Sequence, residues 1–111
     1  MIPLVDLKAQ HDSIRDELFA AITQIVDTSS YIMGPAIKEL EAGFAKFCGC
    51  SHAIGVSSGT SALHVAMAAC GLKAGHEVIT IPHTFIATAE AVTMNGVTVR
   101  FVDIDPTTYT M

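Results

Sequence analysis

Apolar side chains recur at helical spacing in the first half of the chain. Residues 12–27 carry an apolar stripe at intervals of three and four positions, and residues 36–47 carry a second one. A stripe of this kind forms one face of an amphipathic helix, so each segment is predicted to be a helix. Gly49 is predicted to end the second helix, because glycine readily adopts the left-handed conformation that closes a helix. Residues 1–10 alternate polar and apolar positions and are predicted to be extended.

The pattern changes after residue 50. Three short runs, apolar or rich in β-branched side chains, are predicted to be strands: 53–57, 77–81 and 97–104. Two segments between them carry a helical pattern, 60–70 and 84–95, and Gly71 and Gly96 follow them. An order of strand, helix, strand, helix, strand predicts parallel strands joined by right-handed crossovers. The predicted fold class is therefore α/β, a parallel βαβαβ unit preceded by two helices.

Length and composition fit one modest globular domain. The chain has 111 residues, of which 50% are hydrophobic and 15% are charged, so it is not a disordered chain. Six basic against eleven acidic residues give a net charge of −5, which argues against a nucleic-acid partner and against a polybasic membrane contact. No apolar run has the length of a membrane span and the first residues do not form a signal peptide. A cytoplasmic protein is expected.

The cysteines do not form a recognisable metal or disulfide pattern. There are three of them, Cys48, Cys50 and Cys70. Cys48 and Cys50 are separated by one residue, and no second pair of ligands follows His52, so no metal site is expected. Buried or half-buried thiols in a reducing compartment are the preferred interpretation.

A turn of small residues at 57–61 is the first candidate for chemistry. It joins a predicted strand to a predicted helix. At such a junction several backbone N–H groups and the positive end of the helix dipole point at one place, where proteins bind anions and most often phosphate. The turn has neither the Gly-Lys-Ser/Thr of a Walker loop nor the G-x-G-x-x-G of a dinucleotide-binding turn.

Two further loops are predicted to lie at the same edge of the sheet, since ligands of open parallel sheets bind outside the carboxyl ends of the strands. The loop at 81–85 carries His83 and Phe85, and the loop at 103–106 carries Asp103 and Asp105. A phosphate site beside an aromatic ring suits a flat phosphorylated cofactor.

Each of these residues also has a structural interpretation. Small-residue turns are common in α/β proteins, Phe85 could be a core residue, and His83 could be a partly buried ring. Asp103 and Asp105 are predicted to be loop and cap residues whose carboxylates accept hydrogen bonds from nearby N–H groups.

Several blocks together identify a family resemblance. They are IPLVDL at 2–7, the segment 34–45, SSGTSAL at 57–63, GHEVI at 75–79, PHTFIATA at 82–89 and FVDIDP at 101–106. In this order they resemble the DegT/DnrJ/EryC1/StrS sugar aminotransferases over essentially the whole chain. The resemblance implies a fold-type I scaffold that uses pyridoxal 5′-phosphate, and a homodimer. It implies transfer of an amino group from glutamate or glutamine to a nucleotide-linked keto sugar.

The resemblance also assigns residues. Gly59, Thr60 and Ser61 match the positions that hold the cofactor phosphate. Phe85 matches the aromatic residue that stacks on the pyridine ring, and His83 is the second choice for this role.

For the substrate, the resemblance points to a loop near the opening of the site. Tyr31 and Gly34 lie in the part of this chain that matches that loop. It implies two regions: an N-terminal arm with helices at 1–50, and the first part of the cofactor-binding domain at 51–111.

The resemblance implies a lysine that forms a Schiff base with the cofactor and an acid that pairs with the pyridine nitrogen. In the family both lie beyond the region that matches here, and none of the four lysines stands in the family's context: Lys8, Lys38, Lys46 and Lys73. The family's sheet also leaves the strand at 53–57 without a neighbour in this chain. We therefore expect the N-terminal third of an aminotransferase, inactive by itself. A non-catalytic binding or oligomerisation module, and a regulatory relative that binds the cofactor without transamination, are the alternatives.

The lysine context generates a prediction. Pyridoxal phosphate added to the 111-residue chain, followed by borohydride, should leave no stoichiometric adduct on one lysine, because no lysine here matches the one that the chemistry requires. Peptide mass mapping measures this. A specific adduct on one of the four lysines, together with turnover, would contradict the prediction.

Overall fold

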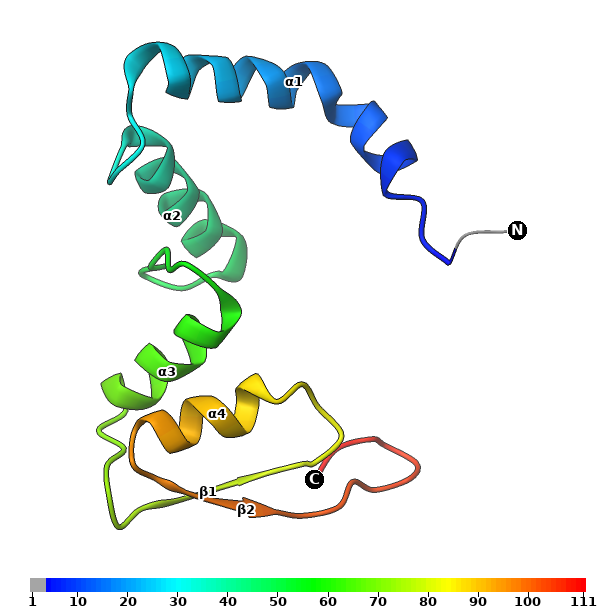
Figure 1. Cartoon of the computed structure of the whole chain (residues 1–111), viewed down its shortest axis with the longest axis vertical. Coiled ribbons are helices and arrows are strands. Elements are labelled where there is room, and N and C mark those ends of the chain that lie inside the picture. Colours follow the sequence, from blue (N-terminus) through cyan, green and yellow to red (C-terminus); the bar gives the residue numbers. More distant parts are fainter. Residues whose placement is uncertain (1–3) are drawn as a thin grey trace. The chain divides into compact units, whose positions relative to one another are not determined.

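The computed structural model describes residues 4–111. The chain divides into two compact units, with the boundary between Gly55 and Val56. The first contains the helices α1 (Leu7–Thr28) and α2 (Pro35–Cys48). The second contains α3 (Gly59–Ala69), β1 (Glu77–Thr80), α4 (Ala87–Met94) and β2 (Thr98–Phe101) (Figure 1). The predicted α/β class is confirmed, and of the predicted βαβαβ unit the described chain forms the two helices and the last two strands, which pair in parallel.

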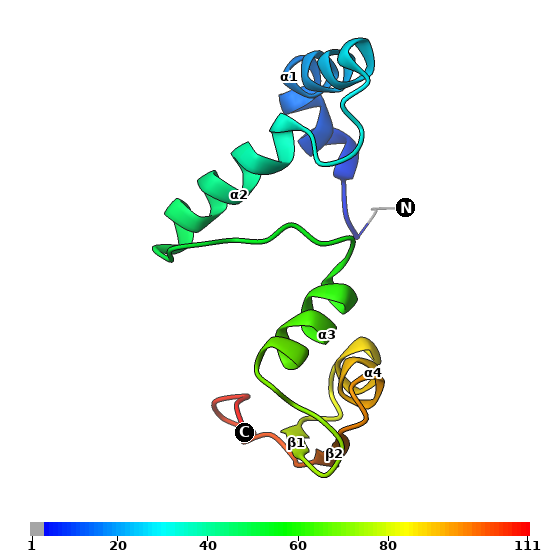
Figure 2. The ribbon, with the colours of Figure 1, turned by 90° about the vertical axis from the view of Figure 1, so that its left-hand side faces the viewer.

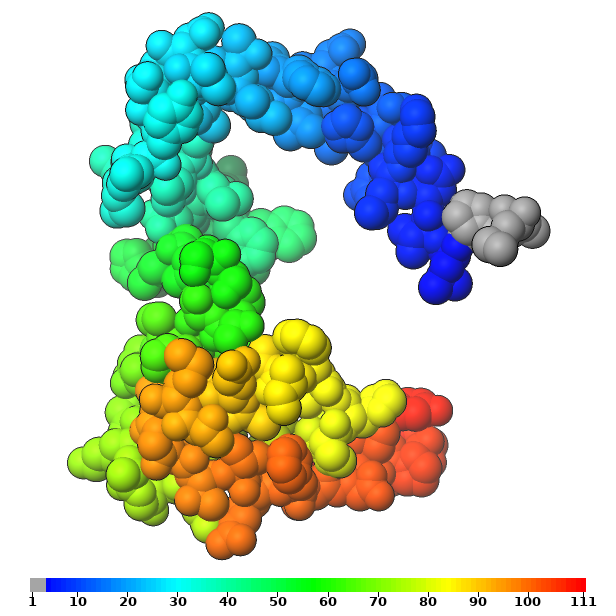
Figure 3. All heavy atoms as spheres, in the orientation of Figure 1, coloured from blue at the N-terminus to red at the C-terminus, as the bar shows by residue number. Residues whose placement is uncertain are grey.

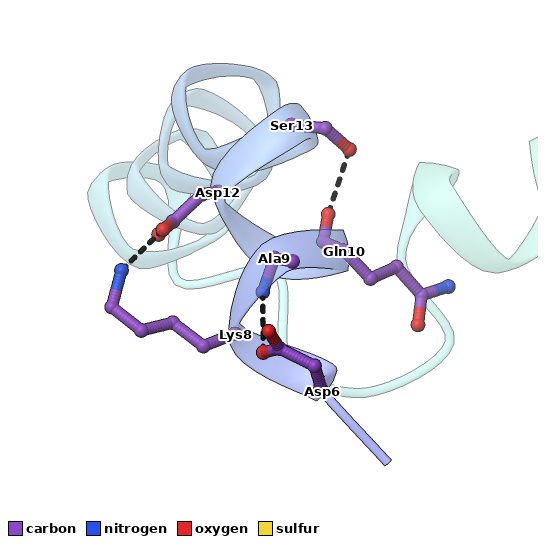
Figure 4. A network of polar contacts seen from close by, with 6 residues as sticks. All are labelled: Asp6, Lys8, Ala9, Gln10, Asp12 and Ser13. Atoms are coloured by element: carbon purple, nitrogen blue, oxygen red, sulfur yellow. Dashed lines mark hydrogen bonds and ion pairs between the residues drawn. The ribbon is translucent and has the colours of Figure 1, made fainter. Parts of the chain in front are cut away.

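Helix α1 begins five residues before its predicted start, so the expectation of an extended segment is wrong from Leu7 onward. The cause is Asp6, whose Oδ1 accepts a hydrogen bond from the backbone N–H of Ala9 at 3.0 Å and so caps the helix (Figure 4). Lys8 then pairs with Asp12 one turn later, which favours the helix further. The first three residues of the predicted extended segment lie outside the described residues.

Helix α2 begins and ends close to its predicted limits. Pro35 occupies the first turn, where a proline costs no helical hydrogen bond. Gly49 has a φ of 67° and ends the helix in the left-handed conformation, as predicted.

The segment at 53–57 forms no strand in the described part of the chain. A strand requires hydrogen bonds to a neighbour, and the sequence resemblance already indicated that this neighbour is not among the 111 residues. Within the first unit, the segment is attached to α2 through Glu41, whose Oε1 accepts a hydrogen bond from the N–H of Gly55 at 2.8 Å. A side chain on a helix therefore binds a backbone group that has no strand partner.

The second unit is built around the parallel pair β1 and β2. Glu77 lies opposite Thr98 and Thr80 opposite Phe101. Helix α4 connects the two strands and packs against both of them, and it also packs against α3 (Figures 1 and 2). On the outer side of the strands, the guanidinium of Arg100 binds Oε1 of Glu77 at 2.7 and 2.8 Å, which ties the two strands across their register.

The core of this unit consists of small side chains. The buried residues are Ala87, Ala91, Val92 and Val97, and both Ala91 and Val92 are fully inaccessible. Three of the four belong to α4, so this helix supplies most of the interior. Many large apolar side chains stay exposed, among them Ile54, Ile79, Phe85 and Phe101. No described helix has the length and apolar character needed to cross a membrane.

Val92 generates a stability prediction. The substitution Val92→Ala should lower the free energy of unfolding by about 2 kcal/mol, because it removes buried methyl groups and leaves a cavity. Val65→Ala on α3, where the valine is 50% exposed, is the matched control and should cost less than about 1 kcal/mol. Chemical denaturation followed by circular dichroism measures both. Equal losses for the two variants would show that α4 does not carry the core.

Candidate functional site

The first turn of α3 has the geometry of an anion site. Ser58 precedes the helix in an extended conformation, and its Oγ accepts a hydrogen bond from the N–H of Ser61 at 3.1 Å. Among the hydrogen bonds of the described chain, none uses the N–H of Gly59 or Thr60. These two donors lie at the positive end of the helix dipole, so the turn can donate to a negatively charged group.

Serine hydroxyls surround this turn and bind one another. Oγ of Ser57 lies 2.9 Å from Oγ of Ser61, and the hydroxyl of Ser58 donates to the same oxygen at 3.1 Å. The hydroxyl of Ser61 is therefore held close to the end of the helix. A hydroxyl can rotate to donate elsewhere, so this cluster can redirect a proton toward an anion.

Gly59 is not required by packing within the described chain. A Cβ placed on it would meet no described atom within 4 Å, and its φ does not lie in the left-handed region. The residue leaves open space beside the first turn of α3. An external group could approach the backbone closely there, which is a common reason for glycine at phosphate-binding turns.

A single open pocket joins this turn to the start of α4. Its volume is about 710 Å³, and its lining includes Gly59, Thr60, Leu63, Phe85 and Thr88. The ring of Phe85 is 75% exposed, so it is not a core residue of the described chain. Figure 3 shows the spheres of α3 and α4 adjoining in this unit. Two helix ends and an exposed aromatic ring thus form one apolar pocket with amide donors at its edge.

Only some of the residues singled out from sequence meet in this pocket. Gly59, Thr60 and Phe85 line it, whereas Ser61 and His83 do not. Ser61 belongs to the same turn, and His83 is exposed in the loop before Phe85.

Thr88 lines the pocket and was missed. Its hydroxyl lies 3.2 Å from that of Thr84. The spacing of four residues between the two threonines was the available signal, because it places them on one side of a helical turn.

Tyr31 and Gly34 lie in the loop between α1 and α2, within the first unit. Tyr31 is exposed, and its hydroxyl donates to the carbonyl oxygen of Val26 at 3.5 Å. Gly34 is buried, and a Cβ on it would come within 2.6 Å of the carbonyl oxygen of Ser30. The described contacts therefore give Gly34 a structural role at the start of α2.

The loop after β2 is closed by Asp105. Its Oδ1 accepts hydrogen bonds from the N–H groups of Thr107 and Thr108, each at 2.8 Å. Donation from the N–H of Thr108, and next from that of Thr107, lowers the pKa of the Asp105 carboxyl below its ordinary value. Asp103 accepts from the N–H of Ile104 at 2.9 Å. The prediction that both aspartates are loop and cap residues is confirmed.

The three cysteines are exposed, so the expectation of buried or half-buried thiols is wrong. The thiol of Cys50 donates to the carbonyl oxygen of His52 at 3.2 Å. Over residues 4–111 there is no group of three His, Cys, Asp or Glu side chains arranged to hold a metal ion.

Comparison with known proteins decides the family. The sequence profile of the DegT/DnrJ/EryC1/StrS aminotransferase family matches residues 12–111. The chain belongs to this family. The resemblance drawn from the sequence blocks is therefore confirmed.

Curated relatives in the DegT/DnrJ/EryC1/StrS family match nearly the whole chain. UDP-N-acetyl-3-dehydro-alpha-D-glucosamine 3-aminotransferase of Acidithiobacillus ferrooxidans is 46% identical over 99% of this chain and 30% of its own length. UDP-2-acetamido-2-deoxy-3-oxo-D-glucuronate aminotransferase of Pseudomonas aeruginosa is 41% identical over 100% of this chain and 31% of its own. A pleiotropic regulatory protein of Geobacillus stearothermophilus is 37% identical over 97% of this chain and 29% of its own length. The chain thus spans about 30% of the length of these relatives.

Solved structures agree with this family. A DegT DnrJ EryC1 StrS aminotransferase from Brucella abortus superposes with a TM-score of 0.92 at 38% identity, over 98% of this chain and 29% of that one. NtdA from Bacillus subtilis, with bound cofactor PMP, gives a TM-score of 0.85 at 29% identity, over 95% of this chain and 24% of that one. The fold of the matched region is that of fold-type I aminotransferases.

The Asp105 loop generates a prediction about pH. Because its pKa is lower in the folded loop than in the unfolded chain, the carboxylate contributes stability that is present above the unfolded pKa. That stability is lost as the pH falls through the folded pKa. The amide proton shifts of Thr107 and Thr108 should titrate with a midpoint below the ordinary pKa of an aspartate, as measured by NMR.

The matched control for this titration is Asp105→Asn. It keeps an acceptor oxygen but removes the ionisable group, so the two amide shifts should stay constant over the same range of pH. A midpoint at or above the ordinary aspartate value in the unsubstituted chain would contradict the prediction.

Proposed function

We propose that this chain supplies the phosphate-binding part of an aminotransferase that uses pyridoxal 5′-phosphate and acts on nucleotide-linked keto sugars, with glutamate or glutamine as amino donor. The observation that supports it is the single pocket in which the unused N–H groups of Gly59 and Thr60 meet the exposed ring of Phe85. Unused N–H groups suit the binding of a phosphate, and an exposed aromatic ring suits stacking on a planar ring.

The relatives support the same class of substrate and cofactor. Two of them are named as aminotransferases of UDP-linked keto sugars, and NtdA holds PMP, the amine form of this cofactor. The identity to these proteins extends over at least 95% of this chain, so the phosphate turn and Phe85 fall within the matched region.

The residues present fit the cofactor. In the proposed site, the N–H groups of Gly59 and Thr60 donate to phosphate oxygens, and the hydroxyl of Ser61 rotates away from Ser57 to donate as well. The open space beside Gly59 admits the phosphate. Phe85 lies against one face of the pyridine ring and excludes water from it. His83 is the second candidate for this contact, and Tyr31 and Gly34 remain candidates near the substrate.

When bound, pyridoxal phosphate supplies an electrophilic carbonyl and an electron sink. The residues of this chain bind and orient it. We propose that the lysine and the acid that the chemistry also requires come from sequence other than these 111 residues, in a cytoplasmic homodimer. The arm and helices at 1–50 and the incomplete cofactor domain at 51–111 are the proposed domains.

One relative favours a second candidate function. The Geobacillus stearothermophilus protein is named as a pleiotropic regulatory protein and is 37% identical to this chain. A regulatory protein of this family would bind the cofactor at the same turn without transamination. Assay of the full-length gene product with a keto sugar nucleotide and glutamate separates the two, since only the aminotransferase forms 2-oxoglutarate.

The phosphate site is tested by comparing pyridoxal phosphate with pyridoxal, which lacks the phosphate. The full-length gene product should bind the phosphorylated form at least about tenfold more tightly, because charged hydrogen bonds contribute that much. Phe85→Ala should lower the affinity for both ligands about threefold to tenfold, because stacking on the ring is lost. Absorbance titration measures the affinities.

Phe101→Ala is the matched control for Phe85. Phe101 is 56% exposed on β2 and does not line the pocket, so its removal should leave both affinities unchanged. Equal affinity of the unsubstituted protein for the two ligands would contradict the phosphate site. Equal effects of the two phenylalanine substitutions would contradict the role of Phe85.

A further inference from the structure

The carboxamide of Asn95 connects α4 to α3. Its Nδ2 donates one hydrogen bond to the carbonyl oxygen of Ala91, at 2.9 Å, and a second to the carbonyl oxygen of His64, at 3.3 Å. Ala91 belongs to α4 and His64 to α3. Among the hydrogen bonds of residues 4–111, no other joins these two helices or their caps.

Asn95 is the residue that follows the last turn of α4, and its backbone N–H does not make the usual helical hydrogen bond to the fourth residue back. Its N–H donates to the carbonyl oxygen of Val92 at 3.1 Å instead of that of Ala91, four residues back. The side chain replaces that missing bond with one hydrogen of Nδ2 and uses the other to reach α3. Both donors of the carboxamide are therefore satisfied in a half-buried position.

The apolar contacts between α3 and α4 do little to fix the position of one helix relative to the other. The buried residues of α4 are Ala87, Ala91 and Val92, which are small and smooth. Apolar burial is not directional, and short side chains interlock weakly, so such a surface allows a helix to slide or rotate at low cost. A hydrogen bond requires a defined distance and angle, so the bond from Asn95 to His64 restricts this motion.

The pocket depends on the placement of these two helices. Gly59 and Thr60 come from α3, whereas Thr88 comes from the first turn of α4 and Phe85 from the segment that leads directly into it. We propose that Asn95 is a positioning residue, which fixes α3 against α4 and so sets the separation between the N–H groups at the start of α3 and the ring of Phe85. Its effect on cofactor affinity rests on the proposed function, whereas its effect on helix placement does not.

The test uses the full-length gene product with Asn95→Asp and Asn95→Ala. The aspartate has nearly the same shape but presents a carboxylate to two carbonyl oxygens, and the alanine removes the donors without adding charge. Thr93→Val is the matched control, because Oγ1 of Thr93 donates to the carbonyl oxygen of Glu90 at 2.9 Å within α4 and does not reach α3.

The first measurement concerns helix placement without ligand. Methyl NOEs between Leu63 of α3 and Ala87 or Thr88 of α4 should weaken or shift in both Asn95 variants and stay unchanged in Thr93→Val. Unchanged NOEs in the Asn95 variants would overturn the proposal, whatever the protein binds.

The second measurement is the ratio of affinities for pyridoxal phosphate and pyridoxal. This ratio should fall about threefold to tenfold in both Asn95 variants and remain constant in Thr93→Val. A general loss of folded protein would lower both affinities together and leave the ratio unchanged, which would overturn the positioning role. If the unsubstituted protein does not distinguish the two ligands, the proposed function fails, and the NOEs still decide whether Asn95 places α3.

Discussion

The second unit depends on the burial of one short helix. Helix α4 connects the two parallel strands, covers one of their faces and packs against α3, and it does so with alanine and valine side chains that are almost completely inaccessible. Small side chains let the helix approach closely, but they bury little apolar area. Parallel sheets are ordinarily covered on both faces, whereas Ile79 of β1 is 56% exposed. In the described chain, the pocket is therefore held together mainly by the small buried side chains of α4.

Because so little apolar surface is buried, hydrogen bonds of polar side chains determine much of how the helices and loops are placed. Ser58 holds the first turn of α3, Asn95 joins α3 to α4, and Asp105 closes the loop after β2. Ser58 satisfies an N–H of the first turn of α3, and Asn95 satisfies the carbonyl oxygen of Ala91 at the end of α4, where the helix itself supplies no partner. Where apolar burial is small, directional bonds at the ends of elements decide how the elements are placed.

Local signals in the sequence predict most of the helices, whereas the differences from the structure come from one local cap and from contacts between distant residues. Gly49 and Gly96 ended helices as expected, because a left-handed residue is a local requirement. Helix α1 begins earlier than its apolar stripe predicts because Asp6 caps it, which is a local effect. The unpaired segment at 53–57 has strand composition but no neighbour, and composition cannot supply one. The spacing of Thr88 from Thr84 is a local signal, but its place in the pocket depends on the packing of α3 against α4.

The same distinction separates the proposed cofactor site from the proposed activity. A phosphate turn needs only a few consecutive backbone groups and a helix, so both its sequence and its geometry lie within one segment of the chain. The proposed transamination also needs a lysine and an acid, which the sequence pattern of this turn does not provide. Within a chain that spans about 30% of the length of its relatives, the turn at 57–61 thus combines two N–H groups free of described hydrogen bonds with open space beside Gly59.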